Sequence, residues 1–120
     1  MDKKTLVIGA STNPNRYSFK AIHKLLANNI QVKAIGVKKG EVGGIPIEEE
    51  GVIFEDIHTI TLYVNPKIQR NYYDYIVNLN PKRVIFNPGT ENPELAELLE
   101  ENGIDFENAC TLVLLSINQY

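Results

Sequence analysis

The sequence predicts one α/β domain, residues 1–120, with a doubly wound, mainly parallel sheet of about five strands and helices on both faces. Short apolar runs typical of buried strands alternate with amphipathic helical segments along the chain. No repeat, linker or low-complexity segment interrupts this alternation. The length of 120 residues, of which 43% are hydrophobic, is suited to one domain with one core.

The first half of the chain is expected to hold two strands and one helix. The apolar run 5–8 ends at a glycine, as a buried central strand often does. Apolar residues at helical spacing predict a helix over residues 16–28, which the asparagines that follow can end because asparagine tolerates a left-handed conformation. Residues 30–37 alternate as a second strand does. The glycine- and glutamate-rich residues 40–51 are expected to form a loop with at most a short strand at 45–47.

The second half of the chain continues the alternation. Residues 59–64 predict a strand, and a proline suited to a first helical turn predicts a helix over residues 66–78. Residues 84–86 form the next predicted strand. In residues 92–106, an Asn-Pro-Glu start and a later glycine predict a helix and then a final short strand. Residues 111–117 are apolar and suit a strand or a helix equally.

The charges are distributed unevenly along the chain. Residues 3–40 hold eight basic and no acidic side chains, whereas the chain from Glu41 on holds four basic and fourteen acidic ones. A strand-to-helix turn at Gly9 lies within the basic stretch, and a helix N-terminus with unpaired N–H groups attracts anions. These features predict an anionic ligand, most simply a nucleotide. The net charge of −3 argues against general nucleic-acid binding.

The position of the ligand follows from the predicted topology. Ligands of doubly wound sheets bind beyond the carboxyl ends of the strands, at the point where the strand order reverses. The segments that follow the predicted strands are therefore the candidate site. These segments are residues 9–17, 36–39, 64–65 and 87–90.

The glycine pattern disfavours NAD as the nucleotide. A dinucleotide fingerprint has glycines at its first, third and sixth positions, where this chain has Gly9, Ser11 and Pro14. An NAD site also has an acid about 20 residues further on. Here the second strand instead leads into Lys38 and Lys39, which suit the additional phosphate of NADP or of coenzyme A. This argument leaves NADP and CoA open.

Several segments together resemble one family. They are residues 7–11, 14–18, 43–47, 87–92 and 96–104, with Cys110. In these segments the chain resembles the small stand-alone CoA-binding domain proteins of bacteria and archaea. Those proteins are Rossmann-like and similar to the CoA-binding part of succinyl-CoA ligase alpha subunits. The resemblance implies CoA or an acyl-CoA as the ligand, with its diphosphate on the loop Gly9–Ser18.

The resemblance and the predicted loops together give a set of candidate ligand-binding residues. Gly9 would allow a tight turn, and backbone N–H groups of the loop that follows would hold the diphosphate. Arg16 would add a charge-assisted contact. Tyr63 or Val64 would border the adenine or the pantetheine arm. The complete set is Gly9, Ala10, Ser11, Asn15, Arg16, Tyr17, Ser18, Val37, Lys38, Lys39, Tyr63, Val64 and Gly89.

We therefore expect a non-catalytic protein that binds CoA or an acyl-CoA as a carrier, a sensor or the partner subunit of a larger enzyme. With one cysteine, Cys110, and two separated histidines, the sequence predicts no catalytic residues and no metal site. One alternative is an NADP-dependent redox domain. Another is an interaction domain with a vestigial nucleotide site, because Val37–Lys39 and Tyr63–Pro66 differ from the family pattern.

The chain lacks the apolar stretches of a signal peptide or a membrane span, so we expect a cytoplasmic protein that does not contact membranes. Three tyrosines within residues 72–75 suggest a homodimer, since tyrosine is enriched at subunit interfaces.

Overall fold

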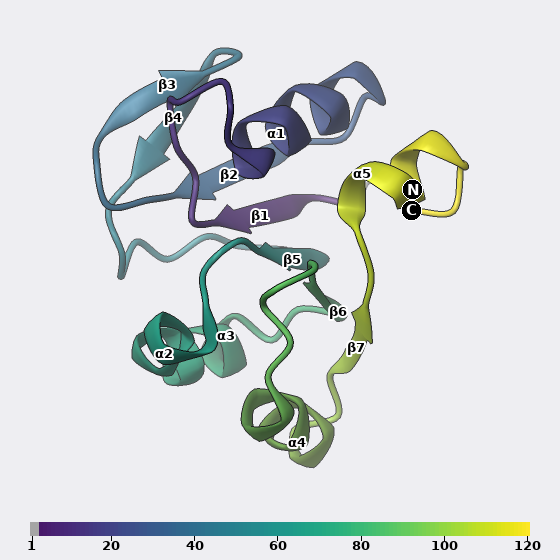
Figure 1. Cartoon of the computed structure of the whole chain (residues 1–120). Coiled ribbons are helices and arrows are strands. Elements are labelled where there is room, and N and C mark those ends of the chain that lie inside the picture. The colour runs from purple at the N-terminus through teal and green to yellow at the C-terminus, as the bar shows by residue number, and fades with distance from the viewer. Residues whose placement is uncertain (1–2) are drawn as a thin grey trace.

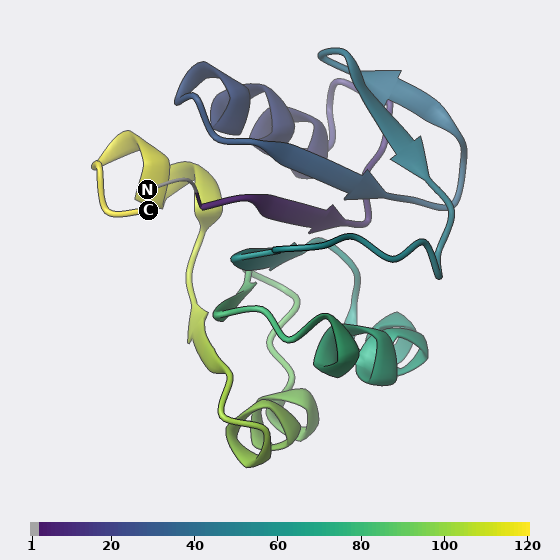
Figure 2. The same ribbon diagram turned by 180° about the vertical axis from the view of Figure 1, so that it is seen from behind.

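A computed structural model describes residues 3–120 of the protein and contains a sheet of seven strands between two layers of helices (Figures 1 and 2). The strands are β1 (Thr5–Ile8), β2 (Val32–Ile35), β3 (Gly40–Val42), β4 (Ile45–Glu48), β5 (Thr59–Leu62), β6 (Arg83–Phe86) and β7 (Asp105–Asn108). The helices are α1 (Tyr17–Ala27), α2 (Pro66–Gln69), the 3-10 turn η1 (Arg70–Tyr72), α3 (Tyr73–Leu79), α4 (Pro93–Glu101) and α5 (Thr111–Ser116).

The strand order is β3-β4-β2-β1-β5-β6-β7, and every neighbouring pair is parallel except β3 with β4. The first strand is thus central, and the chain builds the sheet outward from it in both directions. This is the doubly wound arrangement that the sequence predicts, and the fold class is confirmed.

Two hydrophobic cores lie on opposite faces of the sheet. Successive side chains of a strand point to opposite faces, so Leu6 and Ile8 of β1 enter one core and Val7 enters the other. The core of Leu6 and Ile8 packs against α3 and α4, whereas that of Val7 packs against α1 and α5. Figure 1 shows the same division, with α1 and α5 on one side of the sheet and α2, α3 and α4 on the other.

The sheet has more strands than the five we predict from the sequence. Residues 40–51 are not mainly a loop, because β3 and β4 form an antiparallel hairpin and β4 adds in parallel to β2. Gly43 and Gly44 connect the two strands with φ angles of +58° and +84°. Two consecutive residues of positive φ match the twist of a tight hairpin, which explains the pair of glycines. Val42 and Ile47 of the hairpin are buried beneath α1.

The helical predictions hold with two differences. The segment 66–78 is broken at the turn η1 rather than continuous, and Tyr72, where it breaks, is buried in the core. The ambiguous segment 111–117 is the helix α5, whose Leu115 packs into the core beside α1. The remaining tyrosines of the broken helix also serve their own chain, since the Tyr75 hydroxyl donates to the Val52 carbonyl. A homodimer through these tyrosines remains a prediction.

The longest helix between residues 3 and 120 is α1, with 11 residues. None of the described helices has the length and apolar character needed to cross a bilayer.

Candidate functional site

A cleft of about 550 Å³ opens at the carboxyl ends of the parallel strands. It lies where the strand order reverses, because β2 follows β1 on one side and β5 adds on the other. The loops after β1, β2, β5 and β6 all contribute side chains to it. Ligands of doubly wound sheets bind at this position.

Most of the candidate residues lie together in this cleft. Ten of them line it, namely Gly9, Ala10, Ser11, Arg16, Tyr17, Ser18, Val37, Tyr63, Val64 and Gly89. The other three, Asn15, Lys38 and Lys39, do not line it. The Lys39 ammonium lies 3.4 Å from the carboxylate of Glu49 at an exposed position.

Four further residues line the cleft, namely Asn65, Ile68, Pro88 and Thr90. Three of them, Asn65, Pro88 and Thr90, lie within the segments 64–65 and 87–90. Their position after a strand is therefore the sequence signal that places them at the site. Ile68 lies within α2, and its exposed side chain reaches the cleft from the helix.

The loop after β1 approaches the neighbouring strands very closely. Gly9 has a φ of +97°, and a Cβ on it would lie 2.9 Å from the carbonyl oxygen of Tyr63. A Cβ on Gly36, after β2, would lie 2.4 Å from the carbonyl oxygen of Ala10. Real Cβ atoms do not approach a backbone oxygen so closely, so glycine at both positions fixes the path of this loop between its neighbours.

Several N–H groups of this loop are already used within the chain. The N–H groups of Gly9 and Ala10 both donate to the Ile35 carbonyl at 2.9 Å, and that of Arg16 donates to the Asn13 carbonyl at 3.0 Å. The N–H groups of Ala10 and Arg16 are thus occupied by hydrogen bonds to carbonyls of the chain, and the binding of a diphosphate by this loop stays a prediction that depends on other donors.

The start of α1 carries the donors that remain. Within the described chain, the N–H groups of Tyr17, Ser18 and Phe19 donate no hydrogen bond. No side chain caps this helix, and its first turn has no acidic residue. By contrast, Asn65 caps α2 and Asn92 caps α4. The first residues of α1, including Ser18, line the cleft, so unpaired donors and the positive end of the helix dipole lie at its wall.

The Arg16 side chain adds charge at the same place. It is the N-cap residue of α1 and lines the cleft. A cation is unfavourable next to the positive end of a helix dipole, and no described carboxylate forms an ion pair with this guanidinium. A bound anion would satisfy both the guanidinium and the free N–H groups.

The opposite wall is held by a buried hydrogen-bonded amide. Gln69 is fully buried, and its side-chain nitrogen donates to the carbonyls of Val64 and Thr90, both at 2.8 Å. Its oxygen accepts a hydrogen bond from the Asn92 side chain at 2.9 Å. Gln69 thus ties the loop after β5 to the loop after β6, and the cleft has a rigid wall on this side.

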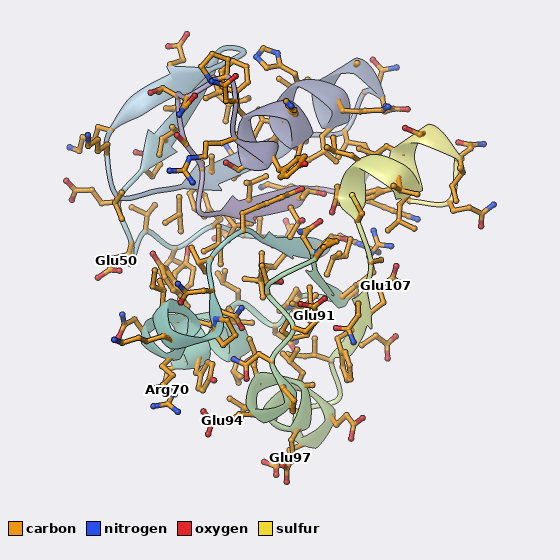
Figure 3. The ribbon with its side chains drawn as sticks, in the orientation of Figure 1. Glu50, Arg70, Glu91, Glu94, Glu97 and Glu107 are labelled. Carbon is orange, nitrogen blue, oxygen red and sulfur yellow. The ribbon has the colours of Figure 1, made fainter. Side chains whose placement is uncertain are left out.

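One acidic side chain lies at that wall. The N–H of Gly89 donates to the Glu91 carboxylate at 2.8 Å, so this donor is not available to a ligand. Figure 3 shows Glu91 on the same side of the molecule as Glu94, Glu97 and Glu107. The wall formed by the loop after β6 therefore carries a negative charge, whereas the wall at the start of α1 carries the positive charge of Arg16.

Tyr63 forms the floor between these walls. Its hydroxyl is buried near the hydroxyls of Thr61 and Thr111 without a hydrogen bond of ordinary geometry. Burial raises the pKa of Tyr63 to about 12, against the lowering effect of the two threonine hydroxyls. The group is therefore a neutral phenol at physiological pH.

The sequence profile of the CoA binding domain matches residues 3–116. The chain belongs to this family. The family and its Rossmann-like fold, as the sequence predicts, are confirmed. A search of curated proteins found no match.

Several solved structures share the fold of this chain. The crystal structure of an uncharacterized protein is 48% identical, with a TM-score of 0.97 over 100% of this chain and 99% of that chain. A conserved hypothetical protein from Pyrococcus furiosus is 27% identical, with a TM-score of 0.79 over 92% and 97% of the two chains. The protein called cell-free ID.343 from Thermus thermophilus is 19% identical and shares the fold, with a TM-score of 0.86 over 99% and 91%.

The ionisable side chains that line the cleft of this CoA binding domain are Arg16, Tyr17 and Tyr63. The residues that line it include no histidine, aspartate or glutamate. His58 precedes β5 and so lies at the opposite end of the sheet. Across residues 3–120, no group of three or more histidine, cysteine or acidic side chains is placed to hold a metal ion.

Proposed function

We propose that the protein binds CoA or an acyl-CoA in this cleft and acts without catalysis, as a carrier, a sensor or a partner of a larger enzyme. The observation that carries the proposal is the uncapped start of α1, where the residues that line the cleft of a CoA binding domain include Tyr17 and Ser18, with free N–H groups, and Arg16. Such donors suit a diphosphate, which is doubly anionic and accepts many hydrogen bonds.

The remaining walls suit the rest of the ligand. Val37 has 98% of its surface exposed beside the cleft, and an adenine ring would cover this apolar side chain. Tyr63, Val64 and Pro88 offer apolar surface to the pantetheine arm. The lack of histidine and carboxylate side chains among the cleft residues supports a binding role, because these are the groups that most often transfer protons in enzymes.

Thermal unfolding of the purified protein with CoA, acetyl-CoA, NADP, NAD and ATP tests the proposal. A ligand present at 100 times its dissociation constant adds about 2.7 kcal/mol to the free energy of unfolding. For a domain of this size that amounts to a rise in melting temperature on the order of 10 °C.

We expect a rise with CoA or acetyl-CoA and none with NAD or ATP. A rise with NADP and not with CoA would instead support a redox domain. The lack of any response would point to a vestigial site and would refute the proposal. Calorimetric titration with the ligand that responds gives its affinity and its stoichiometry.

A further inference from the structure

A second, smaller cavity continues the cleft toward α5. It has a volume of about 220 Å³ and is lined by Tyr17, Tyr63, Asn87, Pro88, Cys110 and Leu112. Three of these residues, Tyr17, Tyr63 and Pro88, also line the cleft. The cleft and this cavity therefore adjoin each other at these three side chains.

The amide of Asn87, the one amide side chain that lines this cavity, is committed to the fold, and the Tyr63 hydroxyl is buried away from solvent. The Asn87 side-chain nitrogen donates to the Thr61 hydroxyl at 2.6 Å and to the Leu62 carbonyl at 2.9 Å. Its oxygen accepts from the N–H of Thr111 at 2.9 Å. These bonds join β5, β6 and the start of α5 and use both hydrogens of the amide. The cavity therefore offers a ligand mainly carbon surface, and a charged group would lose its hydration there without gaining a partner.

The walls that a ligand would touch are the aromatic rings of Tyr17 and Tyr63, the ring of Pro88 and the side chain of Leu112. Contact with such surfaces favours an uncharged hydrocarbon group, because binding removes apolar area of both the ligand and the protein from water. The thiol of Cys110 is compatible with this role, since a cysteine without a charged neighbour acts as a small apolar side chain.

The volume limits the size of the group that fits. One water molecule takes up about 30 Å³ in the liquid, and a methylene group is similar in size, so the cavity has room for roughly seven such groups. With the sulfur and the carbonyl group of a thioester included, the space suits an acyl chain of about four carbons.

We propose that this cavity receives the acyl group of a short-chain acyl-CoA, so that the protein distinguishes a short acyl-CoA from free CoA. The inference rests on the proposed function, because the CoA part of the ligand occupies the adjoining cleft. It goes further by naming the class of ligand, an uncharged short-chain acyl thioester. The sequence gives no local signal for this role of Leu112, because Leu112 is one of several apolar residues in the segment 111–117.

Calorimetric titration with a series of CoA esters tests the inference. The series is CoA, acetyl-CoA, butyryl-CoA, hexanoyl-CoA and octanoyl-CoA, measured with a reductant that keeps the Cys110 and CoA thiols reduced. Each methylene that enters an apolar cavity tightens binding about fourfold. Butyryl-CoA should therefore bind about fifteenfold more tightly than acetyl-CoA, and octanoyl-CoA should lose this gain because its chain exceeds the cavity.

Two variants of one residue then locate the effect. Leu112→Ala enlarges the cavity and should move the best ligand to a longer chain, whereas Leu112→Phe reduces the cavity and should move it to a shorter one. The affinity for free CoA should stay within a few-fold in both. Val113→Ala and Val113→Phe are the matched controls, because Val113 is the next residue of α5, is 53% exposed and lines neither cavity. Melting temperatures check that all four variants fold.

The outcomes separate the inference from the proposed function. A dependence on chain length that shifts with Leu112 and not with Val113 supports the inference. If CoA and all its esters bind equally, or if free CoA binds most tightly, the inference is wrong while CoA binding stands. Equal shifts in the Val113 variants also overturn it. If none of the five compounds binds, the proposed function itself fails.

Discussion

Replacing Gly9 or Gly36, which allow the loop after β1 to pass close to the neighbouring strands, should lower the free energy of unfolding by different amounts. In Gly36→Ala, the added methyl group meets the Ala10 carbonyl oxygen at 2.4 Å, and the backbone must shift. Gly36 does not have a positive φ, so the substitution adds crowding alone. Overpacking of this kind costs about 1–3 kcal/mol.

Gly9→Ala combines two effects. Its methyl group would lie 2.9 Å from the backbone of Tyr63, and its φ of +97° disfavours any side chain. Strain from such a backbone conformation costs about 1–3 kcal/mol, and crowding adds a similar amount. We therefore expect a loss of about 2–6 kcal/mol, which is a large share of the roughly 5–15 kcal/mol that stabilises a typical domain.

Gly103→Ala is the matched control for backbone strain. Gly103 follows α4 with a φ of +69°, and a Cβ there would meet nothing within 4 Å. Equilibrium unfolding in urea measures the free energy of unfolding of all three variants, and calorimetry measures their affinity for CoA. Gly36→Ala should weaken CoA binding because it displaces the loop that lines the cleft, whereas Gly103→Ala should leave it unchanged.

Two results would contradict this reasoning. Gly9→Ala could be no less stable than Gly103→Ala, in which case the close approach to Tyr63 imposes no constraint. Gly36→Ala could match the natural protein in both stability and CoA affinity, in which case the path of the first loop is not fixed by its contact with the loop after β2.

Three further predictions concern single side chains. Arg16→Ala should weaken CoA binding by about 1.5–3 kcal/mol, which is the contribution of a hydrogen bond to a charged group. Calorimetry should find no change in CoA affinity for the control variant Lys82→Ala. An unchanged CoA affinity in Arg16→Ala would show that Arg16 is not part of the site. Glu91→Gln should tighten CoA binding about threefold, as loss of an exposed repulsive charge of roughly 0.5–1 kcal/mol predicts. Weaker binding in the same titration would contradict the expectation that Glu91 repels the anionic ligand from across the cleft. The free energy of unfolding should fall as the pH rises from about 10 to about 12, because burial raises the pKa of Tyr63 to about 12 and the unfolded state therefore loses this proton first. Urea titrations across that range should find a smaller fall in Tyr63→Phe than in the natural protein. An equal fall in the two proteins would show that Tyr63 does not cause the effect.

The sequence predicts most of the fold because the elements that matter carry local signals. The apolar run before Gly9, the asparagine that caps α4 and the proline at the start of α2 each determine a boundary through their own chemistry. The short strand predicted at 45–47 is found as β4, but β3 and the hairpin that it forms were not predicted, since the two strands are only 3 and 4 residues long and contain glycine, glutamate and proline. Its stability comes from tertiary pairing with β2 and from burial under α1, which no local pattern reports.

The site was predicted to a similar degree. The residues of the first loop follow from a strand, a glycine turn and a helix start, all of which are local. Lys38 and Lys39 are predicted from their charge and their position after the second strand, and the direction in which an exposed lysine points is not encoded in the sequence. The opposite wall depends on Gln69, whose role requires two loops that are far apart in the chain to meet. Only the folded sheet brings them together.

The two outer strands of the sheet have a consequence for how the protein behaves at high concentration. An outer strand presents unpaired backbone groups that can join the sheet of another molecule, which leads to aggregation. At one margin β3 has only 3 residues, and at the other β7 carries Asp105 and Glu107. A short strand is a poor template, and like charges repel a second copy of β7. Molecules of this protein are therefore expected not to join into a continuous intermolecular sheet, and any assembly they form would use their helical faces.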